Sequence, residues 1–500
     1  MKVSFLIIFL TLTKALVVAQ QVVDVTVVDS KGVSKTIKTN KPDTVMKKAM
    51  SKQIMIDALA QGSEPIFRSK RDSLSYLVLE NHIAAARTKA PEKLDSLYRE
   101  YGKIMEGGIL GYRKVYRASF TPLDSLKLVK DLSQINQVSI IKFKGNKLPK
   151  EIFTCKNLEE LELVNTSIKR IQGKLNKLPK LKRLIVLNNR PSVPLKLAKN
   201  TKIKTMIIRG ENPSLLPANY KGLKNLSLLD LSNNNLEKFP TGMTQNKNLK
   251  QLLLTNNAIT LTQKEDLPSL QFLEKLDLSK NKIRKVPAQV SNFTSLKQLK
   301  FNFNFIDEVS PDLAKLEKLE ALSFYNNKLL SIPTGVYQLK NLRELDLYYN
   351  EIEKLEYTEC QWPKLEVLYL SFNRVYSVPD NIDKLSLIRE LYLHDNRLIS
   401  IPESIGKLTS LKVLRINNNL LTHLPESLIN LTALENIDFS NNSISTLPIG
   451  LQNYTNLKIL AMVNNPWEES TKDTVVSMAK ELRKRNVVVH LNSYEIGVEE

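Results

Sequence analysis

A pattern of 23 residues recurs through most of this 500-residue chain, and it constrains the fold more than any other feature of the sequence. The clearest copy, at 388–410, reads IRELYLHDNRLISIPESIGKLTS. Its skeleton is LxxLxLxxNxLxxLPxxLxxLxx, with Ile, Val, Phe or Met also allowed at the apolar positions. A fixed period of this length predicts a solenoid of stacked coils. Units begin at Ile135, Leu158, Leu181, Ile203, Leu226, Leu249, Leu273, Leu296, Leu319, Leu342, Leu365, Ile388, Leu411, Leu434 and Leu457.

Each position of the unit has a physical reason. Side chains alternate along an LxLxx strand, so the leucines point into the coil and the residues between them face outward. The Asn follows the strand, where its amide can donate to and accept from backbone groups that would otherwise be buried without partners. The Pro ends regular pairing and starts the outer return path. Strands stack about 4.8 Å apart whereas helical segments need about 8–10 Å, so the array must curve.

This pattern resembles the leucine-rich repeat family, in particular its LP-containing class with 23-residue units. The resemblance implies an α/β fold: a curved horseshoe with a parallel β-sheet on its concave face. About 15 units would occupy 135–466. Asn465-Pro466-Trp467 resembles the opening of a C-terminal cap of this family, so 467–500 is interpreted as a cap in which Trp467 covers the open core, followed by a helix at 470–484 and an edge strand at 487–491.

The first 19 residues have the composition of a secretory signal peptide. Lys2 precedes an apolar run at 3–12, and Val17-Val18-Ala19 is a small-residue cleavage signal that predicts cutting before Gln20. An uncleaved membrane anchor is the alternative, but the run is shorter than the roughly 20 residues of a membrane span. With only Cys155 and Cys360 present, the caps cannot carry the disulfides usual in exported eukaryotic members of the family. These features favour a secreted, periplasmic or cell-surface protein, of a bacterial envelope in particular.

Residues 20–134 differ from the repeats and contain no recognisable motif. The β-branched segments 22–28 and 33–37 flank a turn and predict a hairpin. Apolar spacing predicts helices at 45–60, 74–88 and 91–105, a strand at 112–120 and a helix at 122–133. This region is interpreted as an N-terminal α+β cap with a small helical domain, because solenoids need covered ends. A separate docking module is the alternative.

Motifs of catalysis are absent, and we predict that the protein is not an enzyme. The sequence has no GxSxG, HExxH, CxxC, GxxxxGK[ST] or GxGxxG pattern. The four histidines are scattered, and none has another histidine at metal-ligand spacing. His394 beside Asp395, with Glu390 nearby, is interpreted as an exposed polar patch. Neither a metal nor a cofactor is expected.

The outward strand positions carry the strongest functional signal. They are the third, fifth, seventh and eighth residues of each unit, and over five neighbouring units they are rich in aromatic residues. Such a solvent-facing aromatic patch with polar neighbours has the composition of a protein-binding surface. Aromatic residues also favour strands in general, but earlier units place Ser232, Thr255 and Ser279 at these positions. The predicted anchors are Tyr325, Tyr348, Tyr349, Tyr369, Phe372 and Tyr392, and the predicted orienting charges are Asp346, Glu390, Asp395 and Arg415.

The formal net charge of +22 could indicate nucleic-acid binding, but its distribution argues against that function. Outward strand positions are nearly neutral, which leaves the excess of lysine on the outer loops, the caps and the N-terminal region. The basic ones are Lys142, Arg183, Arg209, Lys275, Lys280, Lys300 and Arg415; the acidic ones are Glu160, Glu162, Asp230, Asp277, Glu344, Asp346, Glu390, Asp395 and Asp438.

The leading hypothesis is a non-enzymatic, exported protein that binds a protein or peptide ligand on its aromatic concave surface. One alternative is a structural cell-surface protein whose basic convex side binds anionic envelope polymers. Another is an enzyme with its site in 20–134. A cytoplasmic scaffold, similar to family members that bind small GTPases, is the alternative if the signal peptide is misinterpreted. The oligomeric state stays open.

Overall fold

The computed structural model divides the chain into two compact units, Met1–Phe120 and Thr121–Glu500. It describes residues 23–28, 34–39, 64–67, 109–113, 121–123, 126 and 131–492, except 191, 211, 263–266 and 356–361. The predicted signal peptide at 1–19 and the predicted helices at 45–60, 74–88 and 91–105 lie outside the described residues.

Two antiparallel strand pairs are described in the first unit. Strand β1 (Val23–Val28) pairs with β2 (Ser34–Thr39), so that Val23 lies opposite Thr39, at the place of the predicted hairpin. Strand β3 (Glu64–Phe67) pairs with β4 (Ile109–Arg113), with a register shift between Ile66 and Phe67. β4 begins before the strand predicted at 112–120, and 114–120 lie outside the described residues.

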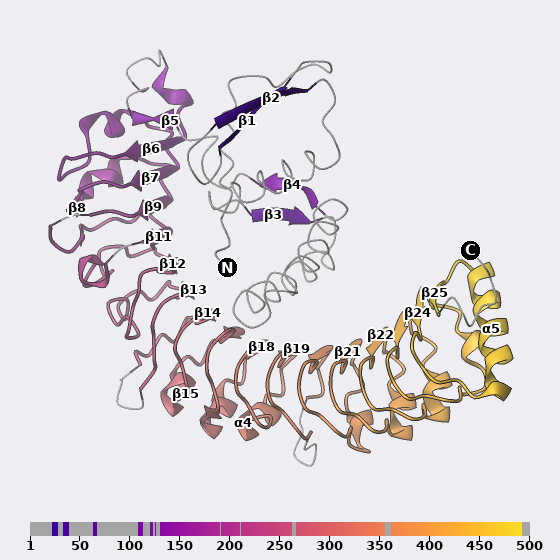
Figure 1. Ribbon diagram of the computed structural model, residues 1–500. Helices are drawn as coiled ribbons and strands as arrows, with labels where there is room; N and C mark the ends of the chain where they lie inside the picture. The colour runs from indigo at the N-terminus through magenta and orange to yellow at the C-terminus, as the bar shows by residue number, and fades with distance from the viewer. Residues whose placement is uncertain are drawn as a thin grey trace, which may run out of the picture. The chain divides into compact units, whose positions relative to one another are not determined.

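A single run of parallel strands organises the second unit, and each strand pairs with the one in the next coil. Figure 1 shows these strands following the inner side of an arc, as the repeat pattern predicted. In spatial order they are β5 (Thr121–Pro122), β6 (Gln137–Ile141), β7 (Glu160–Val164), β9 (Arg183–Leu187), β11 (Thr205–Arg209), β12 (Leu228–Asp230), β13 (Gln251–Leu253), β14 (Lys275–Asp277), β16 (Gln298–Lys300), β18 (Ala321–Ser323), β19 (Glu344–Asp346), β20 (Val367–Tyr369), β21 (Glu390–Tyr392), β22 (Val413–Arg415), β23 (Asn436–Asp438), β24 (Ile459–Ala461) and β25 (Val488–His490).

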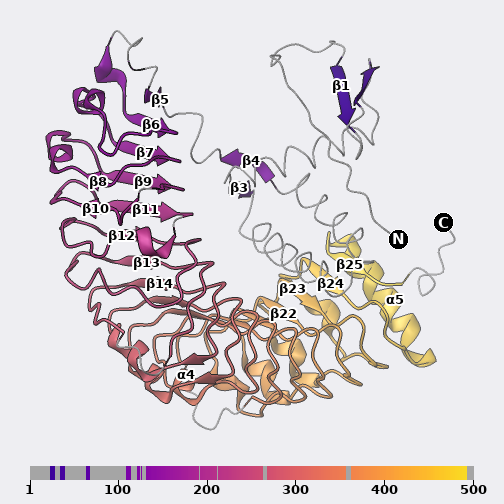
Figure 2. The same ribbon diagram turned by 60° about the vertical axis from the view of Figure 1, so that its left-hand side comes forward.

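The outer side of the arc is made of short turns of helix, which lie opposite the sheet (Figure 2). Many follow the proline of the repeat, as at Pro402 and Pro425, which precede η10 and η11 directly. Since proline fixes φ and lacks a donor, it starts the turn without losing a ladder bond. The turns are η4 (Lys150–Thr154), η5 (Gly173–Lys177), η6 (Pro213–Leu215), η7 (Ala288–Asn292), η8 (Pro311–Lys315), α4 (Thr334–Tyr337), η9 (Ile382–Lys384), η10 (Glu403–Lys407), η11 (Glu426–Asn430) and η12 (Leu451–Asn453). Two short strand pairs join them: β8 (Arg170–Ile171) with β10 (Lys196–Leu197), and β15 (Lys285–Val286) with β17 (Glu308–Val309).

The repeat asparagines form a ladder of buried hydrogen bonds beside the leucine core. Asn373 donates through Nδ2 to the carbonyl oxygens of Leu347 and Leu370, both at 2.9 Å, and its Oδ1 accepts from the N–H of Ile352 at 3.0 Å. The amide thus satisfies backbone groups of its own coil and of the preceding coil, which is the role that its place in the repeat predicted. This ladder and the invariant register hold every strand at the same height, so equivalent repeat positions lie side by side.

Both ends of the array depart from the repeat. The C-terminal end is closed by α5 (Glu469–Lys484) and β25, at the predicted positions, and Trp467 is 6% exposed. At the other end the helix predicted at 122–133 is wrong where the structure describes it, because Pro122 lies in β5 and η3 (Leu132–Gln134) is a short 3-10 turn. None of the described helices is long and apolar enough to cross a membrane.

Candidate ligand-binding surface

Aromatic side chains from five adjacent coils lie together on the sheet face opposite to the leucine core. We call this set the aromatic surface. Its members occupy outward repeat positions in or directly after β16, β18, β19, β20 and β21, and their neighbours in sequence, such as Phe324 and Leu347, are buried in the core. The members are Phe303, Tyr325, Tyr348, Tyr349, Tyr369, Phe372 and Tyr392.

The rings of the aromatic surface contact one another in sequence across the strands. Tyr349 and Phe372 stack with ring centroids 4.3 Å apart, and Tyr369 and Tyr392 stack at 4.8 Å. Tyr348 links the two stacks, since its centroid lies 5.5 Å from Phe372 and 6.2 Å from Tyr369. Strands about 4.8 Å apart bring equivalent side chains to stacking distance, so the repeat register builds a continuous aromatic array.

Two of the predicted anchors are less accessible than the sequence suggested. Tyr325 and Tyr348 are each only 8% exposed, although neither belongs to the leucine core. Their rings lie 6.0 Å apart and each contacts Tyr349. Tyr349, Tyr369, Phe372 and Tyr392 are half-buried. The prediction that all these rings face solvent is therefore wrong for the first two, because a seventh-position ring packs against rings of the same and the neighbouring coils.

Three members of the aromatic surface have an unusual backbone conformation. The residue before the ladder asparagine adopts a positive φ throughout the repeats, and it is Asn in many of them, as at Asn418 and Asn441. Asn tolerates this region, whereas a bulky residue there is an outlier that costs about 1–3 kcal/mol. Phe303, Tyr349 and Phe372 hold φ of 55°, 54° and 54°. In these three coils, an aromatic residue whose ring faces away from the core therefore stands where other coils have Asn.

A chain of polar side chains ends at the centre of the aromatic surface. Asn418 donates through Nδ2 to Oδ1 of Asp395 at 3.0 Å, and Oδ2 of Asp395 lies 2.8 Å from Nδ1 of His394. The other ring nitrogen of His394 is hydrogen-bonded to the hydroxyl of Tyr348. The side chain of His394 is 16% exposed. The cluster read from the sequence as an exposed polar patch is therefore a half-buried network that orients Tyr348, and Glu390 is not part of it.

Carboxylates border the tyrosines on β19 and β21. Asp346 accepts from the hydroxyl of Ser323 at 2.7 Å and from the N–H of Tyr348 at 3.2 Å. Burial nevertheless raises the pKa of Asp346 to about 6. Glu390 accepts from the hydroxyl of Tyr392 at 2.9 Å. Burial, reinforced by Glu390, Glu344 and Asp346, raises the pKa of Tyr369 above its usual value, which keeps that phenol protonated at neutral pH.

Arg415, predicted to orient a ligand, is engaged within the sheet. It lies on β22 beside Tyr392, and its Nη1 forms an ion pair with Asp438 at 2.7 Å. The structure thus places nine of the predicted site residues together, in or directly after β18–β21. The tenth, Arg415, lies on β22 and forms its ion pair with the next strand, β23. Phe303 and His394, which also occupy outward positions of their units, complete the surface.

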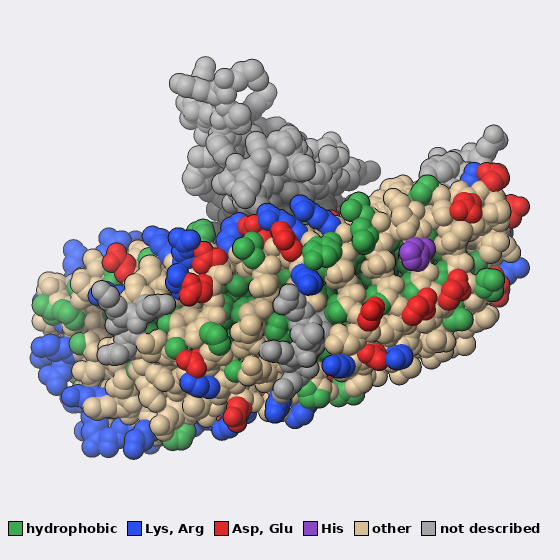
Figure 3. All heavy atoms as spheres, turned by 90° about the horizontal axis from the view of Figure 1, so that it is seen from below, with side chains coloured by type: hydrophobic (Ala, Val, Ile, Leu, Met, Phe, Trp, Pro, Cys, Tyr) green, Lys and Arg blue, Asp and Glu red, His purple; other side chains and the backbone are tan. Residues whose placement is uncertain are grey.

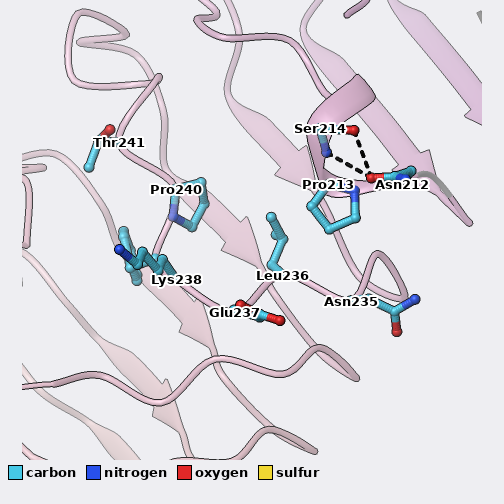
Figure 4. A pocket seen from close by; sticks show the side chains of 10 residues that line it. Asn212, Pro213, Ser214, Asn235, Leu236, Glu237, Lys238, Pro240 and Thr241 are labelled. Atoms are coloured by element: carbon cyan, nitrogen blue, oxygen red, sulfur yellow. Dashed lines mark hydrogen bonds between the residues drawn. The ribbon is translucent and has the colours of Figure 1, made fainter. Parts of the chain in front are cut away.

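A separate groove of about 940 Å³, shown in Figure 4, has no member of the aromatic surface in its lining. Its lining includes Pro213, Leu236, Phe239 and Pro240, which follow the ladder positions of two consecutive coils.

Figure 3, a view from below the arc, shows Lys and Arg side chains gathered near one end and mixed with Asp and Glu elsewhere. Among the described residues, no three His, Cys, Asp or Glu side chains are placed to hold a metal ion.

Comparisons with known proteins agree with this architecture. Residues 360–497 match the family described as a leucine-rich repeat region, and residues 317–375 match one described as leucine rich repeat. Together with the stacked parallel strands and the asparagine ladder, these matches define the chain as a leucine-rich repeat protein.

Particular relatives cover parts of the chain. Over 206 residues it is 30% identical to the protein flightless-1 homolog of Caenorhabditis elegans, a match that spans 34% of this chain and 16% of that protein. The plant peptide hormone receptor RGFR1, solved in complex with RGF2, is 25% identical with a TM-score of 0.50, covering 72% of this chain and 61% of the receptor. A TDR receptor gives 22% identity and a TM-score of 0.52, covering 76% and 72%.

Proposed function

We propose that this chain is an exported, non-enzymatic binding protein whose aromatic surface holds a protein or peptide ligand. Stacked tyrosines supply large rigid contact areas with polar ends, which is the composition of binding hot spots. The observation that carries the proposal is the positive φ of Phe303, Tyr349 and Phe372. Three bulky residues at a position that favours Asn cost stability, and such strain clusters at functional sites.

The likeness to RGFR1 supports the same function. That receptor was solved with the peptide RGF2 bound, and it shares the solenoid over 72% of this chain. A parallel sheet with regular register offers an extended peptide many equivalent outward positions, so affinity depends on which side chains occupy them. Here the rings occupy a contiguous block of coils, and the ligand would lie across them.

The experiment probes an array of random-sequence heptapeptides with the purified chain and with three variants. Tyr369→Ala with Tyr392→Ala removes one ring stack, whereas Tyr349→Asn with Phe372→Asn installs the residue that other coils carry. Leu253→Ala alters the equivalent outward position of β13, outside the aromatic surface, and is the matched control. We expect both double variants to lose about tenfold or more in affinity for the retained peptides, since anchor residues dominate such interfaces.

The control should bind as the unmodified chain does, and all variants should keep the same far-UV circular dichroism spectrum. Repeating the array at 0.5 M NaCl separates contact binding from attraction by the net positive charge, which salt screens. Equal binding by all variants, or binding that disappears with salt and ignores the tyrosines, would contradict the proposal.

A further inference from the structure

Several acidic side chains on the sheet face form an ion pair with a basic residue of an adjacent coil, whereas three acidic side chains around Tyr369 form none with the described residues. Asp438 pairs with Arg415 at 2.7 Å and Asp230 with Arg209 at 2.5 Å. Glu160 pairs with Arg183 at 3.4 Å. Since register places equivalent positions side by side, one basic residue in an adjacent coil is enough to form such a pair.

Beside the aromatic surface, Asp395 lies 2.8 Å from His394, but three other carboxylates have no such partner among the described residues. No lysine, arginine or histidine among them lies within ion-pair distance of Glu344, Asp346 or Glu390. The three carboxylates flank β20, whose own outward positions are Val367 and Tyr369. Asp346 accepts from the hydroxyl of Ser323 and the N–H of Tyr348, and Glu390 accepts from the hydroxyl of Tyr392, so these donors are neutral.

A carboxylate that is half-buried without an ion-pair partner, as Asp346 and Glu390 are, lowers the stability of the free protein. A cation brought by a ligand would remove that cost. Tyr369 is half-buried and lies on β20, between the strands that carry the carboxylates, and aromatic rings attract cations, most often guanidinium. A guanidinium group is planar, so it can stack on a ring while its N–H groups donate to two carboxylates.

We infer that Glu344, Asp346 and Glu390, together with Tyr369 between them, form a subsite for an arginine side chain of the bound peptide. This inference rests on the proposed function and specifies it, because it names the side chain that the ligand must carry. The subsite lies on β19, β20 and β21, and its negative charge is complementary to a guanidinium group.

The test measures retention of four fluorescein-labelled heptapeptide mixtures by the full chain. All are random except at the central residue, which is arginine, citrulline, lysine or glutamate. Citrulline keeps the size and planarity of arginine but lacks its charge. On the unmodified chain we expect the arginine mixture to bind about fivefold or more above the citrulline and glutamate mixtures, as expected for a charge-assisted pair.

Variants assign that preference to the subsite. Asp346→Asn with Glu390→Gln keeps side-chain shape and should abolish the preference for arginine over citrulline. Asp277→Asn, at the same repeat position as Asp346 but on β14, is the matched control and should retain it. Thermal unfolding of each variant shows that the fold is intact.

The outcomes separate the inference from the function on which it rests. In one outcome, peptide binding depends on Tyr369 and Tyr392 and yet shows no preference for arginine; in another, the carboxylate variant retains that preference. Either result overturns the inference and leaves the binding function standing. Equal retention of the lysine and arginine mixtures overturns the assignment to guanidinium. Absence of peptide binding overturns both.

Discussion

At the scale of single residues, the side-chain amide of the repeat asparagine stabilises two neighbouring coils at once. Asn373 hydrogen-bonds backbone groups of two coils, and equivalent asparagines repeat these bonds from Asn234 to Asn465. Burial without these partners would leave several backbone groups unsatisfied, each at a cost of about 1–3 kcal/mol. Single residues also matter for the proposed function, since Phe303, Tyr349 and Phe372 of the aromatic surface each directly precede a ladder asparagine.

The ladder can be tested with Asn373→Ala. We expect the free energy of unfolding to fall by about 2–4 kcal/mol, because an N–H and two carbonyl groups in the interior lose their partner. Asn341→Ala is the control: its amide donates to the carbonyl of Glu317 in the exposed outer turns, and its loss should cost about 0.5 kcal/mol or less. Urea unfolding followed by circular dichroism measures both, and equal effects would refute the ladder's role.

Asp346 predicts how stability depends on pH. Its pKa is about 6 in the folded protein against 3.8 ordinarily, so the folded state holds the proton more tightly than the unfolded chain. This contribution to stability is complete below about pH 3.8 and is lost as the pH rises through about 6. Asp346→Asn should therefore be more stable than the unmodified protein at pH 7.5, by up to about 3 kcal/mol, with a much smaller difference at pH 4. Urea unfolding at both pH values would contradict this if the difference did not change.

At the scale of elements, each coil is stable only because its neighbours cover it. Strands of three residues, such as β20 or β21, cannot hold an isolated sheet together, and the apolar faces of the outermost coils need a cover. Helix α5 supplies that cover at the C-terminal end, where it buries Val475, Met478, Ala479 and Leu482. Its amphipathic spacing identifies it as a cap and separates it from the repeats.

The cap can be tested with Leu482→Asp. Leu482 is fully buried, so the introduced carboxylate should detach α5 and expose the core of the last coils. Hydrogen exchange should accelerate strongly in β23 and β24 and change little in β12, because coupling in a solenoid runs between neighbours. Lys480→Asp, two residues away on the exposed side of the same helix, is the control and should leave exchange in β23 and β24 unchanged. Uniform exchange across the array in the Leu482 variant would contradict this view of the cap.

At the scale of the whole molecule, binding and folding use opposite sides of the same strands. The leucines face the core and fix the stack, so outward positions can vary from coil to coil without loss of the fold. A solenoid grows in one dimension, and its surface therefore grows with every coil added. The block from β16 to β21 uses this freedom for aromatic residues, and the proposed export would present that block outside the cell.

Export makes a prediction of its own. When the full chain is expressed with a C-terminal tag in a secreting bacterial host, we expect the mature protein to begin at Gln20, because signal peptidase cuts after small residues such as Ala19. Mass spectrometry of the purified protein measures this. Ala19→Arg should block cleavage and serves as the control, whereas a mature protein that begins at Met1 would contradict the prediction.

Much of the repeat unit could be predicted from the sequence because its signals are local and periodic. The strand positions, the role of the asparagine, the turn after the proline and the C-terminal helix follow from spacing alone. The accessibility of the rings in the aromatic surface does not follow from spacing. Tyr348 and Tyr369 both occupy outward positions, and only the packing of rings between coils makes Tyr348 buried and Tyr369 half-buried. The partner of Arg415 was missed for a similar reason, because ion pairs depend on which strand lies beside which.

The sequence by itself determined that this chain is a curved stack of coils with a parallel sheet, because strand alternation, an asparagine and a proline recur at fixed places in a 23-residue period. It also determined which residues face away from the core. Only the tertiary structure decided how those residues combine: that His394 joins Asp395 to Tyr348, and that three carboxylates around Tyr369 lie beyond ion-pair reach of any described basic side chain. The physical reason is distance, because these groups come from different coils and their interactions depend on spacing of a few ångströms that register sets.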